Sequence, residues 1–324
     1  MDRSDFAVAA IAGLLAAPHP GLAQEPAFPS RPIRLIVPST PGSPPDVVAR
    51  LIGERLSAAL GQAVVVDNRP GATGMIALQA VAHAAPDGYT LGIIGMPHMV
   101  TPSLVAKMPY DTERDLAAVA LVNWNAHLLA VPTASPAGSV AELLAAAKAK
   151  PGTLRFSSGG SGTPAHIVGE LLSREAGAEM THIPYKSAPA AVAALVSGEV
   201  DLMVGALGPI APHVKAGRLR VLATPAPRRV AAYPELPTFV ELGYPLLEVR
   251  DWQGVVAPAG TRKEVIARLA SEIAGAAATP EVKARLEAVG MEVAVLGPDQ
   301  FAAHIRSELR KWGQLARDAG IKAE

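Results

Sequence analysis

TLRFSSGGSGTPAH, residues 153–166, has the pattern of a short strand, a turn of small residues and the start of a helix. We predict that the Thr163 hydroxyl caps this helix, that Pro164 is its first residue and that Gly177 ends it. Such a turn leaves backbone N–H groups and the positive end of the helix dipole facing outward, where they can bind a carboxylate or a phosphate. A tight strand-to-helix connection without a ligand has the same pattern, so the turn alone leaves both interpretations open.

A second stretch repeats this architecture near the start of the chain. The continuous apolar run IRLIV at 33–37 predicts a strand covered on both faces, and a helix follows at 47–60. Ser43 and Asp46, three residues apart, have the form of a capping box, with Pro44 at the first helical position. We therefore expect Asp46 to be a capping carboxylate rather than a catalytic acid.

Strands and helices alternate with short, glycine-containing turns along most of the chain. This order is typical of parallel sheets with right-handed crossovers, in which ligands bind at the carboxyl ends of the strands. His98 lies in a predicted loop, 95–98, after one such strand. It could contact a ligand there, but a solvated side chain fits the pattern as well.

The stretch LVNWNAHLLAVP, residues 121–132, reads as a strand with polar residues in its middle, which suits a crossing between two lobes. A second crossing near 224–226 would bring the chain back. We predict an α/β fold of two doubly wound, Rossmann-like lobes around a ligand cleft. The first lobe would take residues 24–125 and 226–324, and the second, inserted lobe would take residues 126–225.

The composition excludes several classes of function. Half of the 324 residues are hydrophobic, and 29 Lys and Arg balance 29 Asp and Glu, with no basic stripe of the kind that binds nucleic acid. The chain has no cysteine, so disulfides and thiolate metal sites are excluded. An apolar run at 6–17 and a small-x-small ending at Ala23 predict a secretory signal peptide over residues 1–23, cleaved before Gln24. This predicts an exported protein.

Several further motifs occur in a fixed order along the chain. They are PGS at 41–43 with Asp46, VVVDNRPG at 64–71, PDGYTL at 86–91, PYD at 109–111, SSG at 157–159 with His166, HIPYK at 182–186, LPT at 236–238 and APAGT at 257–261. Over nearly all of its length after the signal peptide, the chain thereby resembles the substrate-binding proteins of tripartite tricarboxylate transporters, the Bug family. The resemblance implies a type II periplasmic binding protein, in which backbone N–H groups and waters hold a small carboxylate between two lobes.

The resemblance places the ligand between two helix N-termini, one from each lobe. The implied ligand-binding residues are Thr40, Gly42, Ser43, Asp46, His98, Ser158, Gly160, Ser161, Gly162, Thr163, His166, Tyr185 and Lys186. Lys186 is the one cation of this set, and it either pairs with a ligand carboxylate or is solvated. The implied partners are a small organic carboxylate and the membrane subunits of a tripartite tricarboxylate transporter. We expect a monomer that uses no cofactor, no metal and no nucleic acid.

Two other functions stay open. The protein could be the binding component of a sensor pathway without transport. It could also be an enzyme, because GSGTPA at 160–165 fits the G-x-G-x-x-A nucleotide motif, although no Asp or Glu ends the next strand to hold a ribose. His166 and Glu170 could share a helix face as metal ligands, but two residues do not fill a site, so we favour a packing or capping role.

Overall fold

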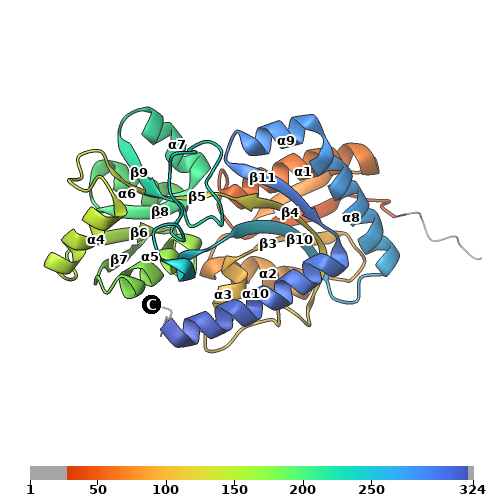
Figure 1. Ribbon diagram of the computed structural model, residues 1–324. Coiled ribbons are helices and arrows are strands. Elements are labelled where there is room, and N and C mark those ends of the chain that lie inside the picture. Colours follow the sequence, from red (N-terminus) through yellow and green to blue (C-terminus); the bar gives the residue numbers. More distant parts are fainter. Residues whose placement is uncertain (1–27, 320–324) are drawn as a thin grey trace, which may run out of the picture.

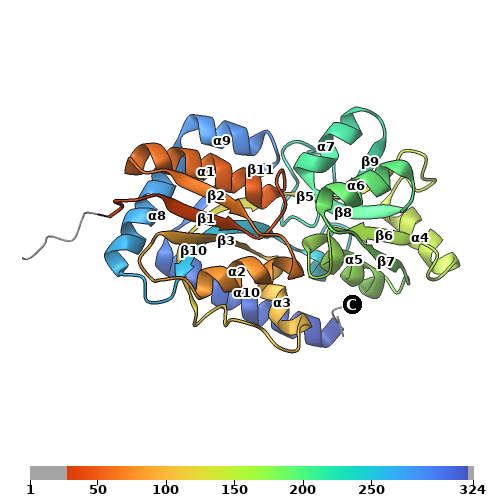
Figure 2. The same cartoon turned by 180° about the vertical axis from the view of Figure 1, so that it is seen from behind.

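The computed structural model of the protein describes residues 28–319 as two lobes, each built around its own β-sheet with helices on both faces (Figure 1 and Figure 2). The predicted signal peptide, residues 1–23, lies outside the described residues. Within residues 28–319, no helix is both long enough and apolar enough to cross a membrane.

The first lobe contains a six-stranded sheet. Its strands are β1 (Ile33–Val37), β2 (Val64–Asn68), β3 (Thr90–Gly95), β4 (Leu116–Asn125), β10 (Asp251–Pro258) and β11 (Met291–Leu296). They lie in the order β11-β4-β10-β3-β1-β2. β1 is parallel to β2 and β3, whereas β10 is antiparallel to both β3 and β4. β10 is buried at all eight positions, as a central strand covered on both faces should be.

Helices cover both faces of this sheet (Figure 2). They are α1 (Pro44–Leu60), α2 (Met75–Ala82), α3 (Pro97–Leu104), α8 (Lys263–Ala278), α9 (Pro280–Glu287) and α10 (Pro298–Ala319), with a short 3-10 turn η1 (Ala72–Gly74) before α2. α1, α8 and α9 share one hydrophobic core with the sheet, and α2, α3 and α10 share the other. α10 is amphipathic and buries Phe301, Ile305 and Trp312, which recur at helical spacing.

The second lobe contains a five-stranded sheet in the order β7-β6-β8-β5-β9. Its elements are β5 (His127–Pro132), α4 (Val140–Ala149), β6 (Arg155–Ser158), α5 (Pro164–Glu175), β7 (Thr181–Pro184), α6 (Ala188–Ser197), β8 (Leu202–Ala206), α7 (Leu207–Lys215) and β9 (Leu219–Ala223). α4 and α5 pack on one face of this sheet, and α6 and α7 pack on the other. After β9 the chain returns to β10 through an irregular segment that holds the 3-10 turn η2 (Pro245–Leu247).

The parallel strands of both sheets have their carboxyl ends at the junction of the two lobes. β4 ends at Asn125 and β5 begins at His127, so the carboxyl end of β4 faces the second lobe. β1 and β3 run in the same direction as β4, because β3 and β4 are both antiparallel to β10. In the second lobe, the first residue of β5 pairs with Ala206, the last residue of β8, and β6 runs parallel to β8 and to β7. The turns that follow β1, β3, β6 and β7 therefore all lie at the junction of the lobes.

Candidate functional site

The turn between β6 and α5 lies at this junction. Gly160 and Gly162 adopt φ angles of 124° and 80°, which residues with a side chain rarely tolerate. Gly159 packs so closely against α6 that an added Cβ would lie 2.8 Å from the nitrogen of Ala188. The small residues therefore allow the N-termini of α5 and α6 to converge on one turn.

Some amides of this turn are already bonded within the protein. Gly160 N donates to Ser158 Oγ (3.1 Å), and Gly162 N donates to His166 Nδ1 (3.1 Å). Gly162 therefore does not offer its N–H to a ligand, contrary to our expectation. In the described part of the chain, the Ser161 amide has no acceptor, and it lies beside a helix N-terminus that favours an anion.

The N-terminus of α5 differs from the prediction, whereas α6 has a side-chain cap. The Thr163 hydroxyl donates to the Gly160 carbonyl (2.7 Å) and makes no capping bond, so the predicted N-cap is wrong, although α5 begins at Pro164 as predicted. The Ser187 hydroxyl accepts a bond from Ala190 N (3.4 Å) and caps α6. The first turn of α5 consequently has no side-chain cap, which leaves its N–H groups for a ligand.

The side chains of Tyr185 and Lys186, the two predicted ligand-binding residues of the HIPYK motif, have no bond to the turn at 158–163 in the described part of the chain. Tyr185 Oη donates to Glu199 Oε1 (2.8 Å), and Glu199 follows the C-terminal end of α6 rather than its N-terminus. Lys186 is exposed and makes no ion pair among residues 28–319. The structure therefore does not bring the Tyr185 hydroxyl to the turn, and it leaves Lys186 solvated.

Two histidine rings lie in contact next to the turn. The rings of His166 and His182 lie 4.3 Å apart, Phe156 packs on His182 at 4.8 Å, and His182 Nε2 lies 2.7 Å from Ser158 Oγ. Burial, and then the neighbouring His182, lowers the pKa of His166 to about 4, so its ring is neutral near pH 7 and Nδ1 can accept a bond. His166 Nε2 lies 3.9 Å from Glu170, but the described residues contain no group of three metal-binding side chains. His166 thus stabilises the turn through its bond with the Gly162 amide.

Asp46 organises the turn between β1 and α1. It is 2% exposed, and its carboxylate accepts bonds from Gly42 N (2.8 Å), Asn68 Nδ2 (2.9 Å) and Arg50 Nε (3.0 Å). Burial alone would raise the pKa of Asp46, but these hydrogen bonds hold it below its usual value. The structural role that we expect for Asp46 fits this geometry. The predicted capping box is wrong, because the Asp46 carboxylate accepts a bond from the Gly42 amide instead of the Ser43 amide.

The same turn offers few donors to a ligand. The Ser43 amide and hydroxyl both donate to the Thr40 carbonyl, at 3.3 and 2.7 Å, and the Gly42 amide is bound to Asp46. Pro44 and Pro45 have no N–H. This turn therefore offers an anion fewer hydrogen-bond donors than a glycine-rich turn with free amides would.

His98 is not in a solvated loop, so the predicted loop at 95–98 is wrong. It belongs to α3, it is 5% exposed, and its Nδ1 lies 3.0 Å from Gly95 N, which donates to it. Gly74 lies against Nε2 so closely that a Cβ there would clash. Burial lowers the pKa of His98 to about 4, although the Gly95 carbonyl, 3.1 Å from Nδ1, favours the protonated ring and opposes this shift. His98 therefore ties the start of α3 to the sheet.

Sequence reasoning missed Thr73, which joins the two lobes. Its hydroxyl donates to the Ser161 carbonyl of the second lobe (3.0 Å). Ala72 and Thr73 adopt φ angles of 46° and 51°, an unusual conformation for residues with a side chain. Leu104 of α3 also reaches this point, since a Cβ at Gly162 would lie 3.3 Å from its Cδ1. The glycine-flanked turn GATG at 71–74, at the same sheet edge, was the signal that could have found it.

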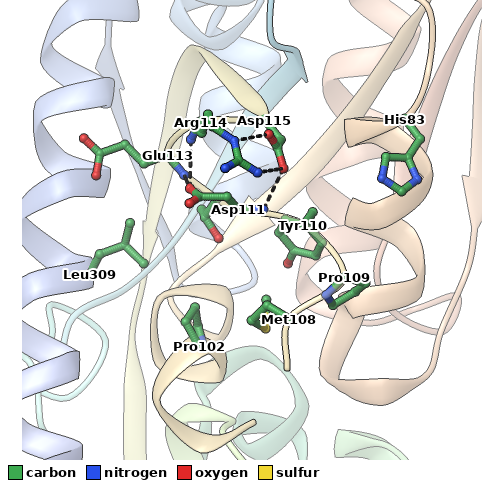
Figure 3. A pocket seen from close by; sticks show the side chains of 11 residues that line it. His83, Pro102, Met108, Pro109, Tyr110, Asp111, Glu113, Arg114, Asp115 and Leu309 are labelled. Atoms are coloured by element: carbon green, nitrogen blue, oxygen red, sulfur yellow. Dashed lines mark hydrogen bonds and ion pairs between the residues drawn. The ribbon is translucent and has the colours of Figure 1, made fainter. Parts of the chain in front are cut away.

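A pocket of about 560 Å³ lies away from this site, between α3, the loop 108–115 and α10 (Figure 3). Asp111, Glu113 and Asp115 contribute to its wall, and Arg114 Nε donates to Asp115 (2.9 Å). None of the predicted ligand-binding residues lines it. Its acidic wall disfavours a carboxylate, so we do not assign the ligand to it.

The facing carboxyl edges and converging helix N-termini define the class of protein as a two-lobed solute-binding protein. The profile of the family described as "Tripartite tricarboxylate transporter family receptor" matches residues 48–321, so the chain belongs to this family. A UPF0065 protein of Bordetella bronchiseptica is 40% identical over 301 residues, which are 93% of this chain and 89% of that protein.

Solved structures agree with this assignment. The periplasmic binding protein BugD has a TM-score of 0.85 and 30% identity, over 92% of this chain and 100% of that one. An R. palustris protein solved with adipate has a TM-score of 0.86 and 34% identity over the same shares. The predicted Bug family and the predicted two-lobed α/β fold are thus confirmed. The family and these structural neighbours are solute-binding proteins rather than enzymes.

Proposed function

We propose that this protein is a periplasmic solute-binding protein that captures a small carboxylate between its lobes and delivers it to a transporter of the tripartite tricarboxylate type. The observation that carries this proposal is the convergence of α5 and α6 on the turn at 158–163, beside the Ser161 amide. Helix N-termini and unbonded amides bind anions without a side-chain cation. The related structure solved with adipate supports a carboxylate as the ligand class.

The predicted ligand-binding residues have three different roles under this proposal. The Ser161 amide and the first turn of α5 hold the carboxylate, whereas Ser158, Gly160, Gly162 and His166 shape the turn. The predicted residues of the first lobe line the site but do not donate hydrogen bonds to the ligand. The same holds for Thr163, Tyr185 and Lys186 of the second lobe. A ligand held by dipoles rather than by fixed cations can leave again when the lobes open.

The proposal includes the lobe boundaries and export. The first lobe takes residues 24–125 and 226–324, the second takes 126–225, and residues 1–23 are removed as a signal peptide. The change of sheet between β4 and β5 and the return after β9 support these boundaries. The periplasmic binding proteins among the relatives support the location.

A thermal-shift series of mono-, di- and tricarboxylates tests the function. A ligand that binds only the folded protein raises the Tm, so we expect at least one member of the series to do so. Ser161→Pro removes the proposed donor and should weaken binding by about tenfold or more, whereas Ser161→Ala keeps the N–H and should bind like the parent. Equal affinity of a folded Ser161→Pro variant would refute the site, and a series without any shift would refute the ligand class.

A further inference from the structure

A second pocket of about 590 Å³ lies at the hinge, beside both crossings between the lobes. Its wall includes Trp124 and Asn125 at the end of β4, the segment 226–232 after β9, Leu207 at the start of α7, and Arg250 just before β10. Elements of both lobes therefore enclose it. Its volume falls in the usual range for small-molecule sites.

Arg250 is the unusual residue of this wall. Its guanidinium lies over the ring of Trp124, 3.8 Å from the centroid, and it has no hydrogen-bond or ion-pair partner in the described part of the chain. The other two arginines of the wall are paired, Arg228 with Glu292 (2.6 Å) and Arg229 with Glu241 (3.0 Å). Burial lowers the pKa of Arg250 without depriving it of its charge. Its N–H donors thus line the pocket without an acceptor.

Asn125 adds a second polar group without a partner. Its Nδ2 donates to Asp251 Oδ2 (3.1 Å), so this end of the amide is bonded within the protein. Its Oδ1 is buried and has no donor among the described residues, and Asn125 as a whole is 5% exposed. A buried acceptor without a donor is costly, and a ligand could supply the missing bond.

Glu287 and Glu292 also line the pocket, beside the three arginines, and the rest of the wall is mostly apolar. Leu207, Ala226, Val249 and Met291 contribute to it, and Trp124 adds an aromatic face. An occupant that matches this wall needs an anionic group for Arg250, an apolar body for these side chains, and a hydrogen-bond donor for Asn125. Hydroxylated aromatic carboxylates combine all three.

We propose that this hinge pocket is a second binding site, distinct from the turn at 158–163, for a small hydroxylated aromatic carboxylate whose carboxylate pairs with Arg250 on the face of Trp124. The proposal does not depend on the proposed function, because no residue of that turn lines the pocket.

Calorimetry with 4-hydroxybenzoate tests the proposal on the full mature chain. Arg250→Gln removes the charge without breaking an ion pair, and it should weaken binding by about tenfold or more. Arg250→Lys keeps the charge but loses the planar donors and should bind with intermediate affinity. Arg268→Gln removes an equal charge from an exposed pair with Glu272 on α8 and should leave binding unchanged.

Two comparisons separate this site from the junction of the lobes. Ser161→Pro should leave the binding of 4-hydroxybenzoate unchanged, and quenching of tryptophan fluorescence by the probe should weaken in a Trp124→Phe variant. Absence of binding, equal affinity of Arg250→Gln and the parent, or loss of binding in Ser161→Pro would each overturn the proposal.

Discussion

Thr73 makes a side-chain hydrogen bond across the junction of the lobes, from its hydroxyl to the Ser161 carbonyl at 3.0 Å. It does so from a left-handed backbone conformation, with a φ of 51°, that β-branched residues rarely adopt. Strain of this kind persists where the surrounding structure requires it. We infer that Thr73 favours the closed arrangement of the lobes.

Thr73→Val should therefore weaken carboxylate binding. Valine keeps the β-branched shape and the backbone strain but removes the donor, and a neutral hydrogen bond contributes about 0.5 to 1.5 kcal/mol. This corresponds to a loss of roughly two- to tenfold in affinity by calorimetry. Thr73→Ser keeps the hydroxyl and should bind like the parent. If Thr73→Val also bound like the parent, the bond between the lobes would have no part in closure.

Two of the buried histidines, His98 and His166, predict how stability depends on pH. The pKa values of His98 and His166 fall to about 4, below the value of about 6.5 for an unfolded chain. Unfolding therefore takes up protons between these values, so the stabilisation present above pH 6.5 is lost as the pH falls toward 4. Each histidine should contribute a slope of about 1.4 kcal/mol per pH unit in that window.

His98→Asn and His166→Asn test this, because the asparagine oxygen can replace Nδ1 as acceptor for the Gly95 and Gly162 amides without titrating. Urea unfolding between about pH 6.5 and pH 5 should show a shallower dependence on pH for each variant. A slope equal to that of the parent would mean that these rings do not stay neutral in the folded protein.

At the scale of elements, the turn between β1 and α1 depends on one carboxylate. Asp46→Ala removes the acceptor for Gly42, Asn68 and Arg50, so the free energy of unfolding near pH 7 should fall by about 1 to 3 kcal/mol. Because the pKa of Asp46 is lowered, this contribution is present above the normal carboxyl pKa of about 3.9 and is lost as the pH falls below it.

Denaturant unfolding checks this prediction, with Asp46→Asn as the matched variant that keeps one oxygen acceptor and should lose less. Carboxylate affinity should change little, because Asp46 faces into its own turn. A large loss of affinity in a stable variant would instead place Asp46 in contact with the ligand.

Element boundaries that depend on local signals could be predicted from the sequence. Proline at the first position begins α1 and α5, since it acts through its own backbone, although α1 begins at Pro44 rather than at the predicted residue 47. Gly61 directly follows α1, and Gly177 lies two residues after the last residue of α5. α9 and β11 could not be predicted. α9 buries only Val282 and Leu286, and β11 is a partly exposed edge strand, so neither shows a clear apolar period.

The hydrogen-bond partners of single polar groups were less predictable than the positions of the turns. The motifs placed the turns at 40–46 and 158–163 in the site, but they did not show that the Gly162 amide is bound to His166. Partners far apart in the chain were also hidden, because Thr73 and Ser161 are 88 residues apart and no local pattern joins them. The close contact between Gly74 and the His98 ring could not be predicted either, because no local sequence pattern joins the two residues.

At the scale of the whole molecule, the two lobes are joined by crossings that can serve as a hinge. The Thr224 hydroxyl donates to the His127 carbonyl (2.8 Å), which holds the two crossings side by side. Binding proteins of this architecture close around their ligands by rotation at such positions. Small-angle scattering with a saturating carboxylate should therefore show a smaller radius of gyration than the unliganded protein. An unchanged radius, with binding proved by calorimetry, would indicate a fixed site.

The central claim is that backbone amides of the second lobe bind the carboxylate. Amide chemical shifts in isotope-labelled protein, titrated with adipate or with the carboxylate that most raises the Tm, test it most directly. We predict saturable shifts of the Ser161, Ala165 and Ala188 amides, with a smaller change at Gly162, whose N–H is bound to His166. Saturable binding that leaves these amides unmoved and shifts only residues elsewhere, such as Leu207 and Met291 at the hinge, would contradict the claim.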